Sequence, residues 1–135
     1  MDLSKVRWIP LNNNVDERGV LTSIEENSDI PFSIKRIFYM HNILKDRGGH
    51  AHTDTEQLVI AMSGQFKVDL SDAKETNTFS MDNAMRGLYM PKMIFTRLYD
   101  FTPGAVCLVL ASTHYDKSKS LRTWEEFKEF TRDQK

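Results

Sequence analysis

Short runs of β-branched and aromatic residues, separated by turn-forming residues, dominate the middle of this chain. Runs of this length are typical of strands in an all-β fold. We predict strands over residues 19–25, 34–43, 57–62, 65–70, 87–90, 95–99 and 105–111, with a loop at the asparagines 12–14. Ser63-Gly64 is expected to form a tight hairpin turn. So many short strands favour a sandwich or barrel, and a jelly roll in particular.

The C-terminal segment has a helical period. Leu121, Trp124, Phe127 and Phe130 recur at three-residue steps among charged residues, and residues 123–126 (Thr-Trp-Glu-Glu) match a capping box. We therefore predict one amphipathic helix at this end. Its aromatic stripe is expected to be a packing face.

Length and composition exclude several classes of protein. The 135 residues suit one domain, residues 1–135, and the net charge of −1, with both signs interspersed, does not favour binding to nucleic acid or to a membrane. The single cysteine, Cys107, lies in an apolar run and cannot form an intrachain disulfide. No apolar run approaches the ~20 residues of a membrane span, and the N-terminus lacks a signal-peptide core. We expect a cytoplasmic protein.

Residues 47–52 (Arg-Gly-Gly-His-Ala-His) contain the strongest indication of a functional site. On a strand, side chains at i and i+2 lie on one face, so His50 and His52 should enter the same space, with Arg47 at its mouth. A purely structural role is the alternative, but each buried imidazole then needs a hydrogen-bonding partner or a lowered pKa. The pair therefore favours a site.

A metal centre is one interpretation of this motif. His50, His52 and Glu56 have a spacing that could supply three ligands to a first-row ion. His114 is the remaining downstream histidine, and the sequence gives it no obvious route to the same centre.

General acid and base catalysis is the second interpretation, because the ordinary pKa of histidine, ~6.5, suits proton transfer near neutral pH. Tyr39 could stabilise an enolate oxygen, or it is simply an aromatic residue on a sheet face. Arg47 could pair with a phosphate oxygen, or it only decorates a loop. Gly48 and Gly49 would permit a close turn just before the strand.

Several segments together resemble the sugar 3,4-ketoisomerases that act on thymidine-diphosphate (dTDP) sugars. The similar segments are residues 16–21 (Asp-Glu-Arg-Gly-Val-Leu), 31–39 (Pro-Phe-Ser-Ile-Lys-Arg-Ile-Phe-Tyr) and 47–52, with Gln57, Tyr115-Asp116, Arg122 and Phe127. The resemblance runs from about residue 6 to residue 130. It rests on the combination of motifs, since either the first or the third alone would be weak.

This resemblance implies a cupin jelly roll that works without metal or organic cofactor. It also implies a homodimer that exchanges an N-terminal strand, for which Trp8, Ile9 and Leu11 would be suitable. The implied reaction converts dTDP-4-keto-6-deoxy-glucose to a 3-keto isomer through an enediolate, in deoxy-amino-sugar biosynthesis. The alternatives are a cupin sugar-nucleotide epimerase and a non-catalytic sugar-nucleotide binding domain.

The resemblance also implies roles for individual residues. His50 would remove the C-3 proton, His52 would assist protonation at C-4, and Tyr39 would stabilise the intermediate or relay the proton. The implied substrate-binding residues are Arg47, Arg18, Gln57 and Arg122. The chain departs from the family pattern at Phe95-Thr96 and at Lys119-Ser120, so substrate contacts are expected to differ there.

Overall fold

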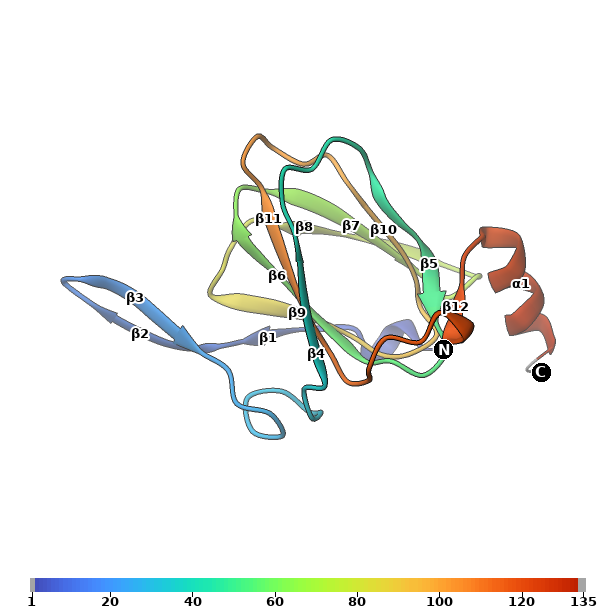
Figure 1. The fold of residues 1–135 in the computed structure, drawn as a ribbon, viewed down its shortest axis with the longest axis horizontal. Coiled ribbons are helices and arrows are strands. Elements are labelled where there is room, and N and C mark those ends of the chain that lie inside the picture. Colours follow the sequence, from blue (N-terminus) through green and yellow to red (C-terminus); the bar gives the residue numbers. More distant parts are fainter. Residues whose placement is uncertain (1, 134–135) are drawn as a thin grey trace.

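The computed structural model describes residues 2–133, which form an antiparallel β-fold closed by one helix (Figure 1). The strands are β1 (Arg7–Pro10), β2 (Asn12–Asp16), β3 (Gly19–Ser23), β4 (Arg36–Met40), β5 (Arg47–His52), β6 (Gln57–Ser63), β7 (Phe66–Ser71), β8 (Thr76–Met81), β9 (Arg86–Met90), β10 (Phe95–Tyr99), β11 (Val106–Ala111) and β12 (Ser120–Leu121). The helix α1 spans Trp124–Asp133, and short 3-10 turns occupy Leu3–Lys5 and Lys117–Lys119.

Two five-stranded sheets face each other, in the orders β1-β9-β6-β11-β4 and β12-β5-β10-β7-β8. We call them the first and the second sheet. Apolar side chains from both inner faces fill the space between them, among them Val59 and Val109 of the first sheet and Val68 and Leu70 of the second. The predicted jelly-roll architecture is confirmed.

The centre of the first sheet is covered on both faces, as the unbroken apolar run of β11 indicates. Cys107 and Val109 face the core between the sheets, whereas Leu110 packs with Leu58 and Ile60 in a second cluster on the outer face. Transferring each such side chain from water contributes roughly 1.5–3 kcal/mol, so the sheets are held by apolar burial.

The expectation of a loop at residues 12–14 is wrong. These asparagines begin β2, which forms a separate two-stranded sheet with β3. Side-chain hydrogen bonds compensate for their low strand propensity. The Asn12 side chain donates to Ser23 Oγ (3.0 Å), the Asn13 side chain donates to the Met85 carbonyl (2.8 Å), and Thr22 donates to Asn13 Oδ1 (2.6 Å).

The predicted C-terminal helix is present, but its first predicted residue is not part of it. Leu121 pairs with β5 in the short strand β12. Thr123 Oγ1 accepts from the backbone N–H of Glu126 (3.1 Å), and the Glu126 carboxylate accepts from the N–H of Arg122 (3.0 Å), one residue earlier than in a standard capping box. The aromatic stripe of the helix packs against Ala51 and neighbouring apolar residues, as predicted.

The strand β8 was not predicted, because its sequence of Thr, Asn and Ser with few apolar residues lacks the usual strand signal. It forms the edge of the second sheet, and within the described part of the chain β7 is its one partner strand. Among residues 2–133, no helix is long and apolar enough to cross a membrane.

Candidate active site

A β-bulge at the start of β5 determines which way the motif of residues 47–52 points. On β10, Thr96 lies opposite His50 and Arg97 lies opposite Gly48, so Gly49 is the extra residue. Both glycines have positive φ, +92° at Gly48 and +76° at Gly49. The glycines therefore belong to the strand itself. The sequence had suggested a close turn just before the strand, and the structure does not have it there.

The bulge reverses the side-chain alternation between Arg47 and the histidines. In a regular strand Arg47 would face away from His50, three residues later. Here Arg47 lies opposite Leu98, whose side chain is in the core between the sheets, and His50 lies opposite the buried Thr96. Residues directly opposite in antiparallel strands share a face, so the bulge places Arg47 on the inner face with the histidines.

His50 and His52 lie together on this inner face. Their ring centroids are 5.1 Å apart and the ring planes are nearly perpendicular. Both side chains are partly buried. The hydroxyl of Ser120, on β12, lies 3.2 Å from His52 Nδ1 and fixes the orientation of that ring. The predicted pairing of the two imidazoles is present in the structure.

Both imidazoles are held neutral. Burial is the largest cause that lowers the pKa of His50, and the guanidinium groups of Arg122 and Arg47 lower it further. Burial, His50 and Arg36 lower the pKa of His52 to about 4. Neutral rings are able to accept protons, and the cationic side chains next to them favour an anionic ligand.

Cationic side chains from three separate segments surround the pair. Arg47 begins β5, Arg36 begins β4 and Arg122 follows β12, and the field of each lowers the pKa of one or both histidines. Tyr115 lies between two of them: Arg122 Nη2 donates to its hydroxyl (3.1 Å), and the Arg36 guanidinium lies 4.8 Å from its ring centroid. Planar guanidinium groups in such a cluster suit phosphate oxygens.

A small pocket next to His52 includes Gln57 and residues that the sequence analysis did not assign to a site. Its lining contains Arg36, His52, Gln57, His114 and Tyr115. Arg36 could have been found from strand alternation, because it lies two residues before Phe38 on one face of β4. Ser120 and Tyr115 come from a segment without regular periodicity, so no sequence signal placed them here. His114 does reach the pocket.

The structure does not bring Tyr39 to the histidines. Tyr39 lies on the outer face of β4, 62% exposed, with its ring 5.4 Å from that of His41. The inward residue at this point of β4 is Phe38, which packs against the core and has no ionisable group. The sequence correctly placed Tyr39 and His41 on one face but assigned that face to the wrong side of the sheet, so the catalytic role predicted for Tyr39 does not hold within this chain.

Arg18 lies outside the site formed by its own chain. It occupies the turn between β2 and β3, at the end of the hairpin that projects from the body of the molecule (Figure 1). Its guanidinium forms a two-pronged ion pair with Asp16, with Nη2 to Oδ2 at 2.6 Å. Glu56 is also directed elsewhere, because it accepts a hydrogen bond from Tyr89 on the outer side of the first sheet. The three-ligand set of His50, His52 and Glu56 is therefore not assembled.

Comparison with known proteins places this geometry in a family. Residues 4–132 match the family described as FdtA: WxcM-like, C-terminal. The chain is 36% identical over 118 residues to TDP-4-oxo-6-deoxy-alpha-D-glucose-3,4-oxoisomerase of Aneurinibacillus thermoaerophilus, covering 86% of this chain and 85% of that protein. It superposes with a TM-score of 0.93 and 32% identity on QdtA, a sugar 3,4-ketoisomerase from Thermoanaerobacterium thermosaccharolyticum crystallised with TDP, over 98% of both chains. A histidine-to-asparagine variant of QdtA, in complex with TDP-4-keto-6-deoxyglucose, also matches with a TM-score of 0.93 and 32% identity, over 98% of this chain and 97% of that one.

Proposed function

The chain belongs to the FdtA, WxcM-like family and is a cupin-type sugar 3,4-ketoisomerase, and we propose that its inner-face histidine pair performs the reaction on TDP-4-keto-6-deoxy-glucose. One observation carries this assignment of the site. Two neutral imidazoles, His50 and His52, lie on one face, and the charges of three nearby guanidinium groups lower their pKa values. This arrangement combines an acid-base pair with a binding site for a pyrophosphate.

The reaction requires two proton transfers at adjacent carbons. In our proposal His50 removes the proton at C-3, the electrons form an enediolate with the former C-4 carbonyl, and His52 assists delivery of a proton to C-4. The former C-4 carbonyl oxygen takes up a proton and becomes a hydroxyl, while the C-3 hydroxyl loses its proton and becomes the new carbonyl. C-3 is oxidised and C-4 is reduced within one molecule, so the balance requires no external oxidant, reductant or cofactor.

The remaining roles follow from charge and position. Arg47 and Arg122 would bind the pyrophosphate or the sugar, and Arg36 joins them as a residue that the sequence analysis had not included. Gln57, buried beside His52, would hydrogen-bond the sugar. We propose that the whole chain acts as one cupin domain. A cytoplasmic location remains part of the proposal, supported by the free, buried Cys107.

Binding of TDP should raise the pKa of both histidines, and this tests the proposed site. Burial and neighbouring guanidinium groups lower these pKa values in the free protein. A pyrophosphate among the arginines adds negative charge, which favours the imidazolium form, so each pKa moves up. Nuclear magnetic resonance titration of the imidazole C–H signals, with and without TDP, measures the change. An unchanged titration of both rings at saturating TDP would place the nucleotide elsewhere.

The lowered pKa of His50 in the free protein gives a pH dependence for the enzyme. His50 must be neutral to remove a proton, and its pKa lies below the usual 6.5. Lowering the pH should therefore reduce kcat/KM only below the usual range for histidine, and the acidic limb should fall at the pKa of His50 measured in the titration.

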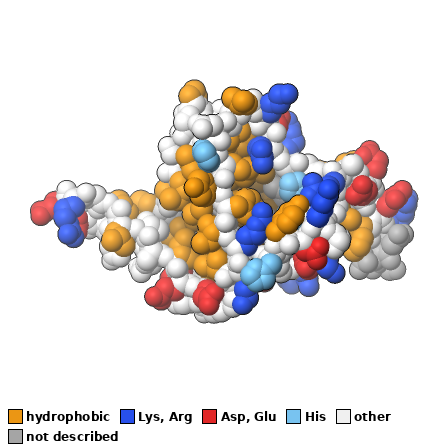
Figure 2. Space-filling view, viewed as in Figure 1, with side chains coloured by type: hydrophobic (Ala, Val, Ile, Leu, Met, Phe, Trp, Pro, Cys, Tyr) orange, Lys and Arg blue, Asp and Glu red, His pale blue; other side chains and the backbone are white. Residues whose placement is uncertain are grey.

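We further propose that the enzyme works as a homodimer in which Arg18 enters the partner's site. The hairpin β2–β3 exposes Val15 (67%), Val20 (51%) and Leu21 (65%). The outer face of the first sheet exposes further apolar side chains, among them Ile37 (59%) and Met62 (50%). Figure 2 shows hydrophobic side chains gathered on this face and continuing toward the hairpin. Exposed apolar areas of this kind mark interaction surfaces.

The structure suggests which element would be exchanged. The strand β1 pairs with β9 of its own chain, with Ile9 and Leu11 buried, so it already belongs to its own sheet. The hairpin, which forms a separate sheet, is the segment free to lie across a second copy. This differs from the expectation that residues 8–11 would be the exchanged strand.

Mixed dimers test the role of Arg18. We expect Arg18→Met and His50→Asn to be inactive or strongly impaired as separate proteins, because each dimer then lacks a required group in both sites. After the two are mixed and allowed to exchange subunits, one site per mixed dimer regains both groups, and activity should return. Mixing Arg47→Met with His50→Asn is the control. Both residues belong to the site of one chain, so each site of the mixed dimer still lacks one of the two groups, and activity should not return. Absence of recovery with Arg18→Met, despite proven subunit exchange, would rule out its action in trans.

A further inference from the structure

We infer that Arg97, on the outer face of the second sheet, is a positioning residue for Arg47: its ion pairs with Asp46 and Asp69 hold the start of β5 in the bulged register. The inference rests on the proposed function, in which Arg47 binds the substrate. Arg97 itself lies on the side of the sheet opposite the histidines, since its neighbours Thr96 and Leu98 face inward.

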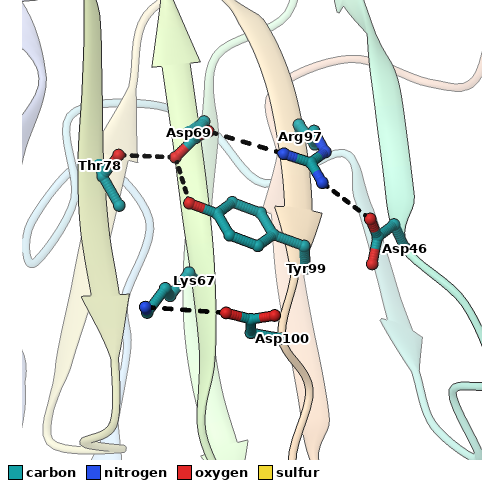
Figure 3. A network of polar contacts seen from close by, with 7 residues as sticks. All are labelled: Asp46, Lys67, Asp69, Thr78, Arg97, Tyr99 and Asp100. Atoms are coloured by element: carbon teal, nitrogen blue, oxygen red, sulfur yellow. Dashed lines mark hydrogen bonds and ion pairs between the residues drawn. The ribbon is translucent and has the colours of Figure 1, made fainter.

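The contacts of Arg97 connect three parts of the second sheet (Figure 3). Its Nη2 lies 2.9 Å from Asp46 Oδ2, and its Nη1 lies 3.9 Å from Asp69 Oδ2. Asp69, on β7, also accepts hydrogen bonds from Tyr99 (2.8 Å) and Thr78 (2.7 Å). Arg97 thus ties the residue just before β5 to a carboxylate that is itself held by its neighbours.

The start of β5 has few other restraints. Gly48 and Gly49 have no side chains and adopt positive φ, so this segment loses more conformational freedom on ordering than other sequences would. On the side away from β10, the short strand β12 pairs only with Ala51 and His52. Within residues 2–133, the backbone of residues 47–50 is therefore paired in the sheet on one side only.

Asp46 immediately precedes Arg47, so the Asp46–Arg97 ion pair acts at the start of β5, just before the bulge. With Asp46 held on the outer face, Arg47 is directed to the inner face by alternation. If this ion pair is lost, the flexible glycines allow the start of β5 to shift out of its pairing with β10, and Arg47 moves away from the histidines. Both charged groups are about half exposed, 50% for Arg97 and 56% for Asp46. Such surface pairs add little to global stability, so their effect should appear in substrate binding.

Arg97→Met and Asp46→Asn test the inference, with Lys67→Met as the matched control. Lys67 forms a 3.7 Å ion pair with Asp100 on the same sheet but away from β5 (Figure 3). We expect the first two variants to raise KM ~3- to 10-fold with kcat changed by less than about twofold, and to leave Tm near that of the unmodified protein. Lys67→Met should change neither kinetic constant. Arg97→Lys, which keeps the charge but not the planar fork, should recover part of the loss.

The titration of His50 without substrate gives a second readout. Because Arg47 lowers the pKa of His50, its displacement in Arg97→Met or Asp46→Asn should move that pKa upward, and Lys67→Met should not. An unmoved His50 titration together with an unchanged KM in both variants would overturn the inference. A loss of Tm, kcat and substrate affinity together, with no recovery in Arg97→Lys, would also overturn it. Failure of the unmodified protein to turn over the sugar would instead contradict the proposed function, while the titration still decides the role of Arg97.

Discussion

Replacing His50 with Asn is expected to reduce kcat by ~10²–10⁴-fold while the protein stays folded. Asparagine is similar in size and keeps a hydrogen-bonding side chain, but it cannot accept the C-3 proton. Because neutral His50 lies among cationic groups, its loss removes no ion pair that holds the fold. The measurement is the initial rate with TDP-4-keto-6-deoxy-glucose, together with thermal unfolding and TDP binding.

His41→Asn is the matched control for that experiment. His41 is exposed and lies beside Tyr39 on the outer face of the first sheet, so the same chemical change there should leave the rate within about twofold. Full activity of His50→Asn, with TDP still bound, would show that another group removes the C-3 proton.

Replacing Gly48 with Ala is expected to destabilise the protein by about 3 kcal/mol and to lower activity further than this loss explains. An added Cβ would lie 2.6 Å from the Thr96 carbonyl oxygen, and the φ of +92° is unfavourable for alanine. The strand must then move away from β10 or lose its bulge, and either change displaces Arg47. Chemical denaturation measures the stability, and KM at a temperature where the variant is folded measures the displacement.

Gly49→Ala separates backbone strain from the steric contact. Gly49 also has positive φ, +76°, but an added Cβ would meet nothing within 4 Å. We expect its cost to be roughly 1–2 kcal/mol, with a smaller effect on KM. Equal losses in the two variants would contradict the argument that close approach of Gly48 to β10 sets the register.

Most of the fold could be predicted from local patterns. The strands β10 and β11 were predicted to within one residue, because segments rich in β-branched, aromatic and aliphatic residues end at clear turn residues. The strand β2 was missed because its stability comes from side-chain hydrogen bonds to Ser23 and Met85, which are distant in sequence. Local propensity contains no information on such partners.

Only part of the site could be predicted from the sequence, because the rest of it depends on partners that are distant along the chain. The i, i+2 rule correctly paired His50 with His52, since two residues suffice to fix a shared face. The same rule cannot say which face of β4 is inward, and Tyr39 was therefore placed on the wrong side. The position of Arg47 depends on a bulge that is visible only when β5 is paired with β10. Arg36 and Ser120 reach His52 through the tertiary fold alone.

The most direct test of the account is proton nuclear magnetic resonance of the protein mixed with TDP-4-keto-6-deoxy-glucose in deuterated buffer. We predict a TDP-3-keto-6-deoxy-hexose with deuterium at C-4, because the C-3 proton leaves and solvent exchange precedes protonation at C-4. The coupling constants of the product would also identify its C-4 configuration. A product that keeps its carbonyl at C-4, or unchanged substrate with no deuterium incorporated, would contradict the proposal that His50 and His52 move the carbonyl between these carbons.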